Sequence, residues 1–283
     1  MFFVWRPRAT LGHNHGDVFH FHPAVSFPMT PMKSAFAIGL VCALATVATC
    51  GSKPEPAPAA ASAGAKHVDP ETTGSVTGKV TFTGTPPKVE TIRMAADPAC
   101  AAAGGAMTTE TAVVAADGSL ANVFVYVKDA FDGYTFDVPA EPVILDQKGC
   151  RYIPHVFGVR VGQPVEFLNS DATAHNVHGL PSENAEFNRG EPVQGTRVRQ
   201  TFTKAEVMIP IKCNLHGWMN AYAGVVTHPY FAVTGADGTF SIPSLPPGTY
   251  TVEAWHELYG TQSQKITIAA KGAQTATFTF AAK

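Results

Sequence analysis

The sequence predicts an all-β protein, and three observations support that prediction. Charged residues make up only 15% of the 283-residue chain, and 22 Pro and 25 Gly provide many turn positions. Several segments alternate apolar and polar residues with a period of two, as half-buried strands do. No long stretch has the apolar spacing of an amphipathic helix. The low charge and the many turn residues are also typical of proteins that work outside the cytoplasm.

The strand-like segments occur both before and after the middle of the chain. Residues 76–84 alternate strictly and are followed by Pro86-Pro87, which ends the pattern. Residues 121–128 form a second strong strand pattern, and residues 165–169 form a third. The part from about residue 235 onward is again rich in such segments. We therefore expect strands over most of the chain after residue 74.

The N-terminal part reads as a targeting segment. Met32-Lys33 and the short apolar run at residues 35–44 are typical of a secretion signal. The following Val47-Ala-Thr-Cys50-Gly resembles a bacterial lipoprotein box, although Thr49 is unusual there, and an ordinary signal peptide cleaved nearby is the alternative. Residues 1–31 do not fit a signal, which suggests that translation starts at Met29 or Met32. We interpret residues 1–49 as an upstream extension and signal peptide.

A segment rich in Pro and Ala follows the expected lipid attachment site at Cys50. Its composition cannot form a packed core, so residues 50–73 are expected to form a semi-extended tether. The mature protein would then be held at a membrane by the lipid on Cys50. The expected location is the periplasm or the outer membrane of a bacterium.

Four residues have the spacing of a metal site. Cys213, His216 and Met219 are three residues apart, and His175 follows the predicted strand at 165–169. A thiolate with two imidazoles and a weak axial Met is the ligand set of mononuclear blue copper sites. Asn176 follows the first His and can hydrogen-bond around the Cys loop. We predict one type 1 copper, bound by His175, Cys213, His216 and Met219.

The same region resembles a known family. The segment from about Pro142 to His228 is similar to the cupredoxins, the plastocyanin- and amicyanin-like blue copper proteins, in its early strands, in Ala-His-Asn-Val-His and in the short Cys213 loop. The resemblance implies a Greek-key β-sandwich that exchanges single electrons with a redox partner such as a cytochrome. It also implies that the His216 ring edge reaches the surface through an apolar patch, which Leu215, Trp218, Leu180 and Pro181 would form.

A second resemblance lies at the C-terminal end. Residues 235–256, with Gly-x-Phe and Leu-Pro-Pro-Gly-x-Tyr, resemble carboxypeptidase regulatory-like domains, which are prealbumin-type β-sandwiches. Their usual first strand looks like the stretch that begins at Gly74. We therefore favour one discontinuous sandwich made of residues 74–140 and 229–283, with the cupredoxin-like domain at 141–228 inserted into it. The alternative is two successive domains, in which the N-terminal strands extend the cupredoxin sheet.

The five cysteines are accounted for in the same way. Cys42 lies in the signal, Cys50 would carry the lipid and Cys213 would bind metal. In an oxidising compartment the remaining pair, Cys100 and Cys150, is expected to form a disulfide. A second metal site that uses His155 lacks enough neighbouring ligands.

Three classes of function agree with these features. They are electron transfer, copper storage, delivery or sensing, and an adhesive or carbohydrate-binding sandwich module. We do not expect an enzyme, because a multicopper oxidase needs paired His-x-His motifs and a binuclear copper centre needs two Cys in the ligand loop. A whole-chain net charge of −2 also gives no nucleic-acid-binding footprint.

Overall fold

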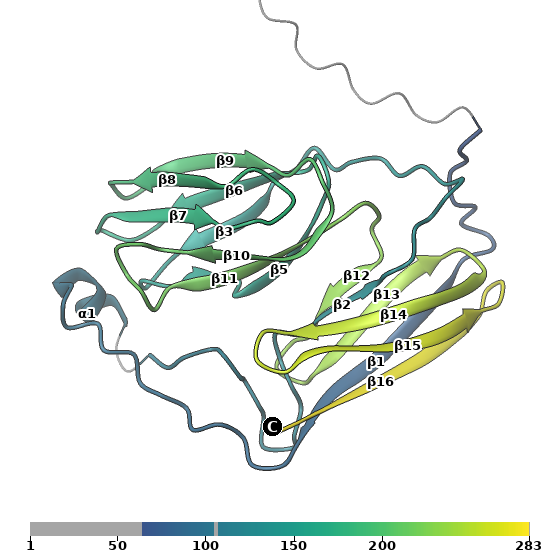
Figure 1. The fold of residues 1–283 in the computed structure, drawn as a ribbon, viewed down its shortest axis with the longest axis horizontal. Coiled ribbons are helices and arrows are strands. Elements are labelled where there is room, and N and C mark those ends of the chain that lie inside the picture. Colours follow the sequence, from purple (N-terminus) through teal and green to yellow (C-terminus); the bar gives the residue numbers. More distant parts are fainter. Residues whose placement is uncertain (1–63, 105–106, 283) are drawn as a thin grey trace, which may run out of the picture. The chain divides into compact units, whose positions relative to one another are not determined.

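The computed structural model describes residues 64–104 and 107–282, which form sixteen strands and one short helix (Figure 1). The predicted all-β class is therefore confirmed. The upstream extension, the signal peptide, Cys50 and residues 50–63 of the expected tether lie outside the described residues. Within the described part, no helix is both long and apolar enough to cross a membrane.

Seven strands form two facing sheets around one core. One sheet has the order β13-β1-β16, and the other has the order β12-β2-β14-β15. Figure 1 shows β1 beside β16, although they come from opposite ends of the described chain, and these two strands are parallel. The alternation predicted for residues 76–84 buries Val76, Val80 and Phe82 in this core. The bounds are β1 Gly74–Thr83, β2 Phe124–Val127, β12 Phe231–Val233, β13 Thr239–Leu245, β14 Gly248–His256, β15 Gly260–Ile268 and β16 Ala273–Ala281.

The nine strands between β2 and β12 form two further sheets and a second core. Their orders are β5-β11-β10-β7-β8 and β4-β3-β6-β9. The predicted strand at 165–169 is confirmed as part of β6, which buries Val165 and Phe167. The bounds are β3 Val143–Gln147, β4 Tyr152–Ile153, β5 Val156–Arg160, β6 Pro164–Asn169, β7 His175–Gly179, β8 Phe187–Glu191, β9 Arg197–Thr201, β10 Glu206–Lys212 and β11 Asn220–Val226.

The chain leaves and re-enters the first pair of sheets at neighbouring points. The strands β2 and β12 pair antiparallel, and the amide of Val127 donates to the carbonyl of Tyr230 at 3.0 Å. A long segment can be inserted between two backbone positions that are this close without distorting the sheet. The nine-strand part therefore starts and ends at one edge of the other sheets.

A third, smaller apolar cluster joins strands of both parts. The ring of Phe124 in β2 lies against Gly158 of β5 and Gly224 of β11, which are paired directly opposite each other. A Cβ at Gly224 would come within 2.4 Å of that ring, so the absent side chain makes the contact possible. Tyr222 and Trp255 add an aromatic pair, with ring centroids 5.1 Å apart.

Two segments differ from the sequence-based division. Residues 74–140 were expected to belong to the prealbumin-type sandwich, but Met94 and Cys100 pack in the core of the nine-strand part. That segment includes the helix α1, Pro98–Gly104. The end of the expected tether is also part of the fold, because Lys66 exchanges backbone hydrogen bonds of 3.0 Å with Gly133 and Thr135. The tether therefore ends before Lys66.

Candidate metal centre

Three adjacent strands bring the predicted ligands together. His175 is the first residue of β7, and Cys213 directly follows β10, which pairs with both β7 and β11. His216 and Met219 lie in the short loop between β10 and β11. Two hydrogen bonds close this loop, from the Met219 amide to the His216 carbonyl at 2.9 Å and from the Cys213 amide to the Met219 carbonyl at 3.2 Å. The loop therefore turns its side chains back toward β7.

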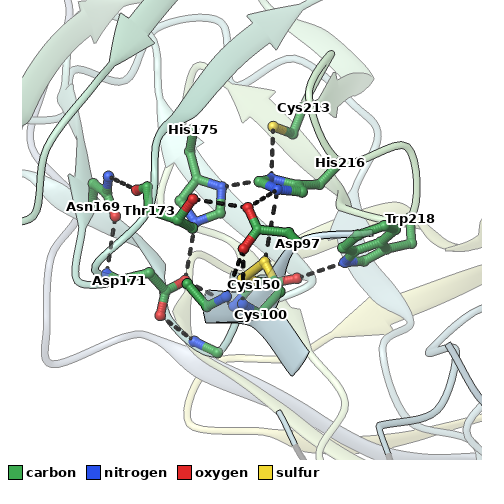
Figure 2. The surroundings of a disulfide bond; sticks show 12 residues. Asp97, Cys100, Cys150, Asn169, Asp171, Thr173, His175, Cys213, His216 and Trp218 are labelled. Carbon is green, nitrogen blue, oxygen red and sulfur yellow. Dashed lines mark hydrogen bonds and ion pairs between the residues drawn. A yellow bond between two sulfur atoms is a disulfide. The ribbon is translucent and has the colours of Figure 1, made fainter. Parts of the chain in front are cut away.

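The donor atoms converge in the interior (Figure 2). The two Nδ1 atoms of His175 and His216 are 3.0 Å apart, and the Cys213 sulfur lies 3.8 Å from Nδ1 of His216. Ligand atoms of these three residues all lie within 4.8 Å of one another. The exposed fraction is 1% for His175, 5% for His216, 3% for Cys213 and 1% for Met219. Met219 belongs to the same core cluster as Cys213.

This donor set suits a metal that accepts thiolate and imidazole. Among the described residues Cys213 is the only free cysteine. Two imidazole nitrogens and a thiol face one another here with little access to water. Their lone pairs can bind one shared metal ion. The residues present therefore fit the copper that the sequence implies.

The polar surroundings hold the ligands in place. The side-chain oxygen of Asn176 accepts a hydrogen bond from the Asn214 amide at 2.7 Å and lies 3.4 Å from the Cys213 sulfur. The hydrogen bonding around the Cys213 loop that was expected for Asn176 is thereby confirmed. Burial lowers the pKa of His175, which keeps its imidazole neutral at neutral pH. A neutral imidazole is the form that binds a metal.

Two carboxylates lie behind the histidines and were not identified from the sequence. Oδ2 of Asp171 lies 3.0 Å from Nε2 of His175, and Oδ2 of Asp97 lies 3.1 Å from Nε2 of His216. Hydrogen bonds, first from the Cys100 amide and then from the Thr173 hydroxyl, lower the pKa of Asp97 to about 2. Asp171 is four residues before His175, a spacing that could have drawn attention to it. Asp97 is 119 residues from His216, and no local pattern connects them.

The predicted disulfide is confirmed and lies beside the site. Cys100 and Cys150 are joined, with their Cα atoms 5.5 Å apart. The Cys100 sulfur is 3.7 Å from Nε2 of His216, and the indole nitrogen of Trp218 donates to the Cys150 carbonyl at 2.9 Å. The disulfide therefore fixes the segment that contains α1 next to the ligand loop.

The expected exposure of His216 is wrong. Only 5% of this residue is exposed, because Asp97 and the disulfide cover its Nε2 side and the Trp218 ring lies 5.1 Å away, measured between ring centroids. Leu215, by contrast, is 60% exposed. Asp97, Leu215, His216 and Trp218 border a surface depression of about 290 Å³, which Thr173 also lines.

Two further histidines, His178 and His155, have hydrogen-bond partners in the protein. His178 makes hydrogen bonds to Asn214 at 3.1 Å and to Glu186 at 2.7 Å on the surface of the loop region. His155 is buried and lies 2.7 Å from the Glu257 carboxylate. These contacts agree with non-ligand roles.

Comparisons with known proteins give partial matches to both predicted parts. Residues 221–281, from β11 to β16, match the family model of the carboxypeptidase regulatory-like domain. No curated protein sequence matches the chain. The family-model match begins inside the nine-strand part, upstream of the boundary predicted at residue 229.

Solved structures similar to the chain include three copper proteins. A Cu-containing nitrite reductase from Thermus scotoductus SA-01 is 25% identical over 34% of this chain and 24% of its own, with a TM-score of 0.29. A Cu(I) amicyanin variant is 24% identical over 31% of this chain and 86% of its own, with a TM-score of 0.27. A purple cupredoxin from Nitrosopumilus maritimus is 19% identical over 29% of this chain and 98% of its own, with a TM-score of 0.26.

The matched region thus spans about a quarter of the nitrite reductase and most of each small copper protein. The chain resembles cupredoxins over about a third of its length and matches the carboxypeptidase regulatory-like family at its C-terminal end.

Proposed function

We propose that this protein is an extracytoplasmic, membrane-tethered type 1 copper protein that transfers single electrons. One observation carries the proposal: the Nδ1 atoms of His175 and His216 and the sulfur of Cys213 converge in a buried site. Copper held by these residues and Met219 would supply one electron by cycling between Cu(I) and Cu(II). The tether and the lipid on Cys50 would keep the protein at the membrane.

The enclosure of the site supports electron transfer over catalysis and over copper delivery. Catalytic metal sites keep a coordination position open to substrate, whereas all four proposed ligands here are at most 5% exposed. A delivery protein must release its metal to a partner. This site is enclosed by a disulfide-tethered segment and an aromatic ring. Such a site is better suited to keep its copper through the change between Cu(I) and Cu(II) than to release it.

We also propose that the nine-strand part is a copper domain inserted into the other sandwich, with boundaries near residues 140 and 229. The pairing of β2 with β12 and the parallel pairing of β1 with β16 support this organisation over two successive domains. The contact of Phe124 with Gly158 and Gly224 would then anchor the copper domain on the sandwich that carries it.

The exposed Leu215, beside the half-buried Trp218, marks the face at which a redox partner such as a cytochrome would bind. Exposed apolar residues near a buried centre are a common feature of such contact faces. Electrons would pass from His216 toward the surface beside Leu215 and Trp218, since the Nε2 side of His216 is covered.

Electron exchange with a c-type cytochrome tests this proposal. The copper-loaded protein should show a reversible one-electron wave and should keep its metal when challenged with a Cu(I) chelator. Leu215→Lys should slow exchange several-fold with an unchanged spectrum. Val193→Lys is the matched control, because Val193 is similarly exposed (63%) and does not border the depression. Rapid loss of copper to the chelator, with no reversible wave, would favour storage or delivery instead.

A further inference from the structure

The outward-facing nitrogens of both histidines meet carboxylates. His175 and Asp171 are 3.0 Å apart at Nε2 and Oδ2, and His216 and Asp97 are 3.1 Å apart at the corresponding atoms. A carboxylate accepts a hydrogen bond but cannot donate one when ionised, so it favours the tautomer with hydrogen on Nε2. That tautomer leaves the Nδ1 lone pair of each ring free, and the two Nδ1 atoms are the ones that face each other.

Backbone and hydroxyl donors hold both carboxylates in place. Oδ1 of Asp97 accepts hydrogen bonds from the amides of Ala99 at 2.8 Å and Cys100 at 3.1 Å, and its Oδ2 accepts one from the Thr173 hydroxyl at 2.8 Å. These bonds orient the carboxylate at the start of α1. Because Thr173 is two residues before His175, the same bond connects the α1 segment to the strand of the other ligand.

Asp171 is anchored in a similar way from the other half of the disulfide. Its two oxygens accept hydrogen bonds from the amides of Gly149 and Cys150, each at 2.7 Å. Its own amide donates to Asn169 at 2.9 Å. The side chain is therefore fixed by two hydrogen bonds besides its contact with His175, and the backbone of the same residue by a third.

The disulfide joins these two anchors. The Cys100 amide binds Asp97, the Cys150 amide binds Asp171, and the two sulfurs are bonded to each other (Figure 2). A displacement of either half-cystine would therefore disturb the carboxylate that orients one of the two histidines. Segments 50 residues apart are in this way coupled at the metal centre.

We propose that Asp97, Asp171 and the Cys100–Cys150 disulfide form one positioning frame that aims Nδ1 of both histidines at the metal. The role of this frame in metal binding rests on the proposed copper function. The contacts that form the frame do not depend on it. Carboxylates behind ligating imidazoles raise their basicity, and their loss typically lowers metal affinity 10- to 100-fold. Asp97 and Asp171 are positioning residues, since they act through the histidines.

The first test uses the metal-free, disulfide-bonded protein and nitrogen NMR of the histidine rings. Both His175 and His216 should be in the tautomer with hydrogen on Nε2. Asp97→Ala should change the tautomer of His216 alone, and Asp171→Ala should change that of His175 alone. In Asp97→Asn the one remaining oxygen is expected to serve the amides of Ala99 and Cys100, so the NH2 group would face Nε2 of His216 and should change its tautomer as Asp97→Ala does. Unchanged tautomers in both Ala variants would overturn the proposal.

The second test measures Co(II) affinity through its thiolate absorption. Each Asp→Ala variant should bind about 10- to 100-fold more weakly than the wild type. The double Cys→Ser variant should bind at least as weakly and should alter both histidine signals. Asp117→Ala is the matched control, because this carboxylate also accepts hydrogen bonds from a local backbone amide and hydroxyl, those of Ser119, but lies beside the other core. Equal affinity of all variants would refute the frame.

The two proposals can fail separately. If the tautomers and the Co(II) affinity respond as stated but Cu(II) gives no reversible couple, the frame stands and the electron-transfer function fails. If copper gives a reversible couple while the tautomers and the affinity ignore both carboxylates, the function stands and the frame is wrong.

Discussion

We expect the buried Glu191 to make the stability of the nine-strand part depend on pH. This residue ends β8, is fully buried, and accepts a hydrogen bond from the Gln147 side chain, while its Oε1 has no protein partner among the described residues. Burial is the main cause that raises its pKa from 4.5 to about 7. The carboxyl is therefore neutral in the folded protein at pH 5 but ionised in the unfolded chain.

The sign and the size of the effect follow from this shift. Because the folded pKa is raised, the stabilisation is fully present below pH 4.5 and is lost as the pH rises through 7. A difference of about 2.5 pKa units corresponds to about 3 kcal/mol. We expect the free energy of unfolding of the wild type to fall by up to that amount between pH 4.5 and pH 8, relative to a variant without the titrating group.

Urea unfolding of the metal-free protein at several pH values measures the effect. Glu191→Gln keeps the shape of the side chain but does not ionise, so its unfolding free energy should lack this fall. Glu183→Gln, at a largely exposed carboxylate, should follow the wild type. Buried histidines such as His228, whose pKa burial lowers to about 4, titrate alike in all three proteins and cancel in the comparison. Identical pH profiles for the wild type and Glu191→Gln would show that Glu191 is not neutral in the folded protein.

Three further predictions concern the frame, the axial ligand and the contact between the two sandwiches. Replacing both half-cystines by Ser should lower the free energy of unfolding by about 4 kcal/mol, since the bond joins residues 50 apart; an unchanged denaturation midpoint would contradict this. Met219→Gln should lower the reduction potential, because a stronger oxygen donor favours Cu(II), and unchanged voltammetry would show that Met219 does not face the copper. Gly224→Ala should destabilise the protein by about 1–3 kcal/mol through its clash with Phe124, whereas Gly190→Ala meets nothing within 4 Å and should be close to neutral; equal melting temperatures of the two would contradict the contact.

The parts that the sequence predicted well depend on local patterns. Alternation at residues 76–84 and the run at 165–169 predict strands because a half-buried or buried strand selects such residues locally. The spacing of Cys213, His216 and Met219 identifies the ligand loop because one short loop must present all three. The cysteine count predicts the disulfide because few other roles were left for that pair.

The features that could not be predicted from the sequence depend on contacts between distant segments. The covering of His216 requires Asp97, which is held there by the disulfide, by the Thr173 hydroxyl and by the packing of Met94 in the core of the nine-strand part. No spacing encodes such a contact. The helix α1 could have been found, since Asp97 and Pro98 are favourable residues at a helix start. Its position over the metal centre could not.

A titration with Cu(II), followed by visible and EPR spectra, decides whether His175, Cys213, His216 and Met219 form a type 1 copper site. We expect an intense thiolate-to-copper absorption that saturates at one copper per protein. Cys213→Ala should abolish this colour while the far-UV circular dichroism of the β fold persists. A colourless wild-type protein, or a Cys213→Ala variant that stays blue, would contradict the assignment.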